Sequence, residues 1–116
     1  MKNLNIEKCM RIISELVSFC HQEGAEEFTV NFTHSIKEGI WVISVSCPMP
    51  PLNQELLDRF AEQLNIPRQH EIEQDYWELC GEAEMSGELT LVGMMIDDAK
   101  VGYRDGVLYI HVKRKD

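Results

Sequence analysis

The chain has 116 residues, 44% hydrophobic and 27% charged, a composition typical of one globular domain rather than a disordered chain. Its formal net charge of −9 argues against nucleic acid as a partner, because a phosphate backbone would be repelled. No apolar run approaches the roughly 20 residues of a membrane span, and the N-terminus lacks the apolar core of a signal peptide. We therefore expect a single domain over residues 1–116, in the cytoplasm and without a membrane partner.

The N-terminal part predicts a helix over residues 6–23, because apolar side chains recur there at intervals of three and four. Asn5 is the expected N-cap, and Gly24 is the expected residue of positive φ after the last turn. Alternating apolar and polar residues then predict strands over 28–34 and 40–47. The short connection between them favours an antiparallel hairpin.

The second strand places Trp41, Ile43, Val45 and Cys47 on one face and stops at a proline-rich stretch, Pro48 to Pro51. Proline cannot donate a hydrogen bond to a neighbouring strand, which explains the end of the strand. A second amphipathic helix is predicted over residues 53–64, before Pro67.

Residues 67–87 are acidic and the least regular in pattern. From Glu71 to Glu88 there are seven acidic residues and no Lys or Arg, whereas the other 13 of the 20 acids are nearly balanced by 11 basic residues. Tyr76 and Trp77 lie within this segment. They are expected to anchor the segment to the body of the domain, with a ligand-stacking platform as the alternative.

The C-terminal part predicts one more helix and a second hairpin. Residues 88–99 fit either a helix or a buried strand, and we favour the helix. Asp105-Gly106 joins predicted strands 101–104 and 107–113 by a two-residue turn. The basic residues of 113–115 are expected to be a solvated chain end. The predicted fold is therefore α+β, a two-layer sandwich in the order α-β-β-α-α-β-β. Helices would cover one face of a mixed or antiparallel sheet of about four strands.

The cysteines indicate reduced thiols rather than a metal site. Cys9, Cys20, Cys47 and Cys80 are widely spaced and form no CxxC pair, so buried thiols are expected. The alternative is a zinc site that uses Cys20 and His21 with distant ligands. His21, His34, His70 and His111 occupy no catalytic motif, and His34 and His111 alternate with apolar residues as sheet positions do.

Four local stretches together resemble the ATP-binding fold of histidine kinases and gyrases, and most closely the bacterial anti-sigma serine kinases. In chain order they are SELVSFC (14–20), VISVSCPMPP (42–51), LTLVGMMID (89–97) and KVGYRDGVLYIHVKR (100–114). They correspond to the family's Glu-and-Asn helix, the strand that ends in Asp-x-Gly, the helix after the glycine-rich lid and the closing strands. The resemblance covers residues 6 to 114.

The resemblance also implies which pocket residues have been replaced. Glu15 matches the family's catalytic acid, but Phe19 stands where an asparagine would ligate Mg²⁺, and a phenyl ring offers that cation no oxygen. Cys47 stands at the position of the adenine-binding aspartate, and Met49 at that of the glycine. The lid keeps one glycine, Gly87. We therefore expect neither ATP nor another cofactor, no metal and no enzymatic activity.

Three functional hypotheses follow. The first is a non-catalytic domain that binds another protein, such as a transcription or signalling regulator, through Tyr76, Trp77, Glu78 and the outer face of the first helix. The second is a serine kinase that binds ATP and Mg²⁺ in an atypical pocket, with Glu15 as base and Asp75, Glu78 or Asp97 as metal ligands. The third is a thiol function at Cys47, although no Lys, Arg or His lies nearby in sequence to lower its pKa. Whether the protein forms a homodimer through a sheet edge stays open.

Overall fold

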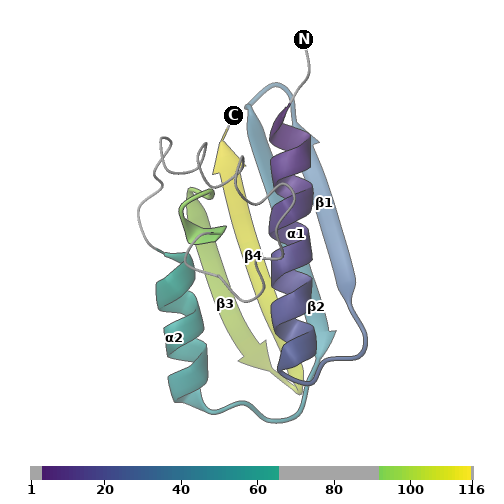
Figure 1. Ribbon diagram of the computed structural model, residues 1–116, viewed down its shortest axis with the longest axis vertical. Coiled ribbons are helices and arrows are strands. Elements are labelled where there is room, and N and C mark those ends of the chain that lie inside the picture. The colour runs from purple at the N-terminus through teal and green to yellow at the C-terminus, as the bar shows by residue number, and fades with distance from the viewer. Residues whose placement is uncertain (1–3, 66–91, 116) are drawn as a thin grey trace.

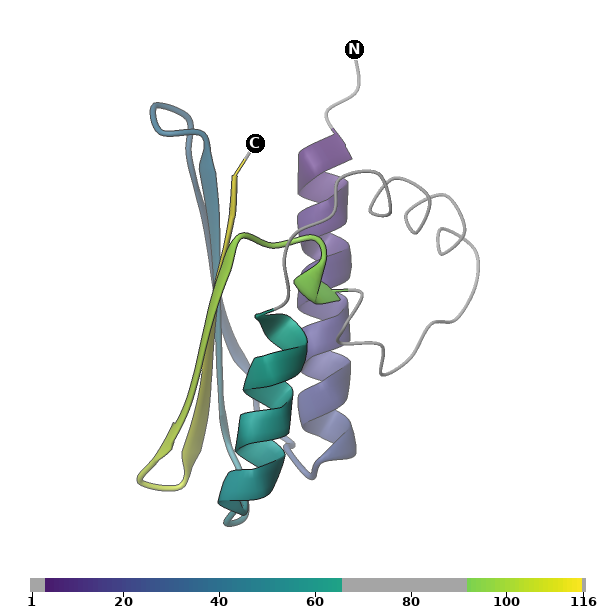
Figure 2. The same cartoon turned by 90° about the vertical axis from the view of Figure 1, so that its left-hand side faces the viewer.

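The computed structural model describes residues 4–65 and 92–115. These form two helices and four strands: α1 (Leu4–Gln22), β1 (Thr29–Ser35), β2 (Ile40–Pro48), α2 (Gln54–Leu64), β3 (Asp98–Arg104) and β4 (Val107–Lys115). The strands make one antiparallel sheet in the order β1-β2-β4-β3, and both helices lie on the same face of it (Figures 1 and 2). The predicted two-layer α+β fold is confirmed, whereas the predicted order α-β-β-α-α-β-β is matched only roughly by the described order α-β-β-α-β-β. None of the described helices is long and apolar enough to cross a membrane.

The turns and helix ends follow from residues with special backbone preferences. Gly24 has a φ of 110° after α1, and the N–H groups of Gly24 and Ala25 donate to the carbonyls of His21 and Cys20, a Schellman motif. Asp105 and Gly106 have φ values of 53° and 77°, as a tight hairpin turn requires. The antiparallel pairings of β1 with β2 and of β3 with β4 confirm both predicted hairpins.

Both helix starts differ from the prediction, which began the second helix at Asn53 itself. Asn53 caps α2, because its side-chain oxygen accepts a hydrogen bond of 2.7 Å from the N–H of Leu56. Asn5 was expected to cap α1, but that prediction is wrong: α1 already begins at Leu4. Asn5 instead accepts a hydrogen bond from the side chain of Arg114, 3.0 Å away.

The predicted helix over residues 88–99 is wrong at its C-terminal end. Val92 and Gly93 are helical, but the chain turns at Met94 and Met95, and strand β3 begins at Asp98. The last two residues of the predicted helix, Asp98 and Ala99, pair with β4. Residues 88–91 lie outside the described part of the chain.

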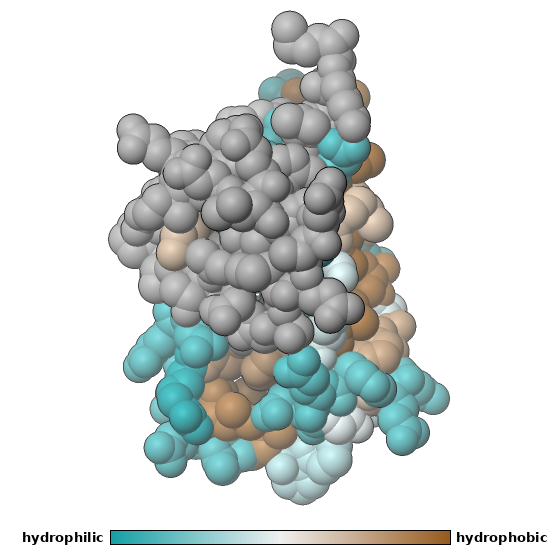
Figure 3. Space-filling view, viewed as in Figure 1, coloured by the Kyte–Doolittle hydropathy of each residue, from teal (hydrophilic) through white to brown (hydrophobic). Residues whose placement is uncertain are grey.

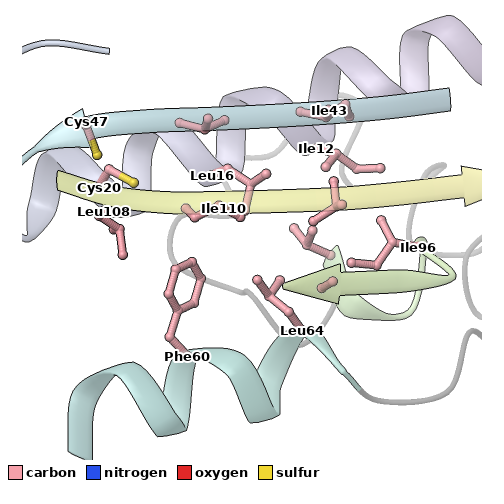
Figure 4. Close-up of a cluster of buried hydrophobic side chains, with 14 of the residues drawn as sticks. Ile12, Leu16, Cys20, Ile43, Cys47, Phe60, Leu64, Ile96, Leu108 and Ile110 are labelled. Carbon is pink, nitrogen blue, oxygen red and sulfur yellow. The ribbon is translucent and has the colours of Figure 1, made fainter. Parts of the chain in front are cut away.

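The core lies between the sheet and the helices. Its buried apolar residues come from the inner faces of α1, α2, β2 and β4 and from the segment before β3 (Figure 4). They include Cys9, Ile12, Leu16, Cys20, Ile43, Val45, Cys47, Phe60, Leu64, Val92, Met95, Ile96, Leu108, Ile110 and Val112. α1 packs over β2 and α2 packs over β3. Cys9, Cys20 and Cys47 are buried free thiols, as expected, whereas Cys80 lies outside the described residues.

One basic residue is part of this core. The segment Lys113 to Lys115 was expected to be a solvated chain end, but all three residues belong to β4, and Arg114 is only 2% exposed. Its guanidinium donates to the carbonyl oxygen of Met95 at 2.6 Å and to Asn5 at 3.0 Å. The prediction is therefore wrong for Arg114, and its side chain joins α1, β4 and the turn before β3.

No helix among the described residues covers the opposite face of the sheet (Figure 2). The strand registers place Ser44 beside His111 there, and the Ser44 hydroxyl lies 2.8 Å from His111 Nδ1. The charged side chains on this face are those of Asp98, Lys100, Arg104, Lys113 and Lys115. His34 and His111 occupy sheet positions, as predicted.

Candidate functional site

The residues at the expected nucleotide positions lie on α1 and at the end of β2. Phe19 projects from α1 towards α2, where its ring stacks on Phe60 with a centroid separation of 4.2 Å and an interplanar angle of 28°. Aromatic rings at that separation are in direct contact, so the pair joins the two helices. Phe60 was not expected to be part of the site. Phe60 belongs to the apolar stripe of α2, and that pattern could have predicted that its side chain faces the core.

Cys47 occupies the expected aspartate position and packs against Cys20. Both thiols are fully buried, and their side chains point towards one another from β2 and α1 (Figure 4). Burial, more than any other cause, raises the pKa of both thiols above the ordinary value of 9.0. Both therefore stay protonated at neutral pH, and Cys47 presents no negative charge.

Met49 occupies the expected glycine position, and its backbone is fixed on both sides. Its N–H donates to the carbonyl of Gly106 at 2.9 Å, and its own carbonyl accepts from the Tyr103 hydroxyl at 3.1 Å. Its side chain is only 7% exposed. The proline-rich stretch is thereby attached to the turn between β3 and β4.

Met49 also lines a recess of about 350 Å³ at this end of the sheet. The other lining residues are Gly24, Glu26, Glu27, Pro48, Pro50 and Gly106. Among these described residues two are glutamates and none is a Lys or Arg, so this part of the lining repels an anion such as a triphosphate.

Glu15 is buried in α1 at 5% exposure, with one carboxylate oxygen 3.4 Å from Nε of Arg11, one turn earlier. A catalytic base must reach the proton that it removes, directly or through one water. Arg11, which this carboxylate contacts, belongs to the same helix. Asp97, an expected alternative metal ligand, lies at the opposite end of the sheet from Met49 and accepts a hydrogen bond from the backbone of Lys115.

The remaining expected site residues are only partly placed. Gly87, Tyr76, Trp77, Glu78 and Asp75 lie outside the described residues. The zinc alternative was to use Cys20 and His21, but His21 Nδ1 lies 3.2 Å from the carbonyl of Ala25, and Cys20 contacts Cys47. Within residues 4–65 and 92–115 no three His, Cys, Asp or Glu side chains are grouped as a metal site.

Comparison with known proteins adds no family: no protein-family model matches the chain, and neither does any curated protein. The resemblance to the histidine-kinase-like ATPases therefore stays a prediction. A functional proposal for this chain therefore rests on the geometry of the described residues.

Proposed function

We propose that the chain is a non-catalytic regulatory domain that binds another protein. Its scaffold would be that of the histidine-kinase-like ATPases, with nucleotide binding lost. The observation that carries this proposal is the stacking of Phe19 on Phe60 at 4.2 Å. The Phe19 ring fills space between α1 and α2 and gives Mg²⁺ no oxygen ligand.

The second support is the environment of Cys47. An adenine amino group needs a hydrogen-bond acceptor at this position, and a protonated thiol is a weak one. The Cys47 thiol is also fully buried and faces Cys20 in the core. Losing a hydrogen bond to a charged acceptor costs about 1.5–3 kcal/mol of binding energy.

A third support comes from charge. Glu26 and Glu27 line the recess beside Met49, and none of the described residues that line it is a cation. Kinase sites surround transferring phosphates with cations and backbone N–H groups. Glu15, the only expected catalytic residue, contacts Arg11.

The test is a calorimetric and thermal-shift titration of the full chain with ATP and ADP, each with Mg²⁺. A ligand at about 100 times its dissociation constant would add about 2.7 kcal/mol to the free energy of unfolding. We expect no heat of binding and no shift at millimolar nucleotide. A clear shift would contradict the proposal, and γ-phosphate transfer that disappears in Glu15→Ala would then establish the serine kinase.

The protein-binding half of the proposal needs its own experiment. Chemical cross-linking in the native cells, followed by affinity capture of the chain, should return one regulatory protein reproducibly. Tyr76→Ala combined with Trp77→Ala should lose that protein, whereas Glu55→Ala, an exposed change on α2, should retain it. Purified partner and chain should then bind directly. Capture of no specific protein would contradict this half.

A further inference from the structure

Strand β1 is an edge of the sheet without the usual protection. Among the described strands it pairs with β2 alone, and its seven residues, TVNFTHS, include no Lys, Arg, Asp, Glu, Pro or Gly. Proteins commonly blunt such edges with charges, prolines or bulges, because the unpaired backbone groups recruit another strand. The other edge, β3, does carry charges, at Asp98, Lys100 and Arg104.

An apolar strip lies next to this edge. α1 covers β2 and α2 covers β3, so neither helix packs chiefly on β1. Val30, on the helix-facing side of β1, is 38% exposed. On α1, Ile6, Met10, Ile13 and Val17 recur at helical spacing on the flank away from Phe19, and Ile6 and Met10 are 47% and 52% exposed. Figure 3 shows hydrophobic surface along α1 on the side of β1.

We propose that a second copy of this chain docks on β1, so that two antiparallel β1 strands join the two sheets into one of eight strands. A two-fold axis beside Phe32, the central residue of β1, pairs all seven residues. In that register Asn31 lies opposite Thr33 of the partner subunit, and Val30 opposite His34 of the partner subunit. The apolar strips of the two α1 helices then lie on the same side of the joined sheet.

Charge makes this surface suitable for a second copy of the same chain. A two-fold axis brings equivalent patches of the two copies together, so a charged patch would meet like charges there. β1 has no charged side chain, and neither Ile6, Met10, Ile13 nor Val17 is charged. On the open face, Thr29, Asn31, Thr33 and Ser35 offer polar side chains for pairing across the axis.

The test is the mass of the full chain in solution, measured by light scattering and sedimentation velocity from low micromolar to near-millimolar concentration. We expect a dimer. Asn31→Lys combined with Thr33→Lys changes two exposed residues and places lysines opposite lysines across the axis, so the variant should be monomeric. Met10→Glu should raise the dimer dissociation constant at least tenfold, whereas Gln22→Glu, an exposed change at the end of α1, should not.

Ser46→Lys is the matched control for the edge. Ser46 lies on the same open face, opposite Thr29, but β2 is paired on both sides. This variant should stay dimeric. A wild-type monomer at every concentration would overturn the proposal, as would dissociation by Ser46→Lys to the same extent as by the β1 variant. Neither outcome bears on nucleotide binding, so the proposed function is tested separately.

Discussion

The side chain of Arg114 donates a hydrogen bond of 2.6 Å to the backbone carbonyl of Met95, inside the core and 19 residues away in sequence. A second bond, to Asn5, links the same guanidinium to α1. One residue near the C-terminus thus holds together the first helix, the last strand and the turn that precedes β3. Arginine suits this place because its planar group offers several donors in a fixed geometry.

Replacing Arg114 should therefore be costly. Arg114→Ala leaves the Met95 carbonyl without this donor and opens a space in the core, so the free energy of unfolding should fall by about 2–4 kcal/mol. Arg114→Lys should recover part of the loss, since an ammonium cannot span both acceptors as the guanidinium does. Urea unfolding followed by circular dichroism measures both. Lys113→Ala, an exposed neighbour, should change stability by less than about 0.5 kcal/mol, and equal effects at 113 and 114 would contradict the role of Arg114.

The contact between Phe19 and Phe60 should be measurable as a coupling energy. Phe19→Ala should lower the free energy of unfolding by about 2–3 kcal/mol, less than for a fully buried ring, because Phe19 is only partly buried. In a double-mutant cycle with Phe60→Ala, the two changes should couple by about 0.5–1.5 kcal/mol. Strictly additive losses would mean that the stacking contributes nothing of its own.

The two glycines of the β3–β4 hairpin should respond in opposite ways to alanine. Gly106 has a φ of 77°, which an L-residue adopts at a cost of about 1–2 kcal/mol, so Gly106→Ala should destabilise the protein by that amount. An added Cβ at Gly102 meets nothing within 4 Å, and its φ is not positive. Gly102→Ala should be neutral or stabilising by about 0.5 kcal/mol. Thermal unfolding of both variants measures the two effects. An equal melting temperature for Gly106→Ala and the wild type would contradict the positive φ at Gly106.

The buried thiols should make stability fall in alkaline solution. Burial holds the pKa of Cys20 above the ordinary 9.0, and the neighbouring Cys47 raises it further. A raised pKa in the folded state means that the unfolded chain loses its proton first. Stability is thus fully present below pH 9.0 and declines above it, by at most about 1.4 kcal/mol per pH unit for one thiol.

Urea unfolding at a series of pH values from about 8 to about 10.5 measures this decline. Cys20→Ala serves as the control, because tyrosines and lysines titrate in the same range in both proteins. The variant should lose less stability per pH unit than the wild type. Parallel curves would show that Cys20 does not have a raised pKa.

The elements that the sequence predicted well are those whose determinants are local. Asp105-Gly106 is a strong signal for a tight turn because it lies between two alternating stretches. Asn53 stands three residues before Leu56, where the apolar stripe of α2 begins. The helix expected over 88–99 failed at its end because a short apolar run fits helix and strand equally well. Pairing of Ala99 with Val112 decides the matter, and no local pattern reveals such a long-range pair.

The candidate site shows the same limit. The replacements at Phe19, Cys47 and Met49 could be read from the sequence once the family resemblance was proposed. Their contacts with Phe60, Cys20 and Tyr103 could not, because each joins segments far apart in the chain. The prediction for Arg114 failed although the residue continues the alternation of Leu108, Ile110 and Val112 on the inner face of β4. That alternation could have placed it in the core, had its charge not favoured solvent.

The strand order β1-β2-β4-β3 has a consequence for folding during synthesis. β4 follows every other described element in the chain, yet it must lie between β2 and β3. Until it leaves the ribosome, β3 has no partner, and β1 and β2 form an isolated hairpin, which is marginally stable in water. The nascent chain therefore exposes both edges of the β1–β2 hairpin until β4 emerges, and the four-stranded sheet can close only from that moment on.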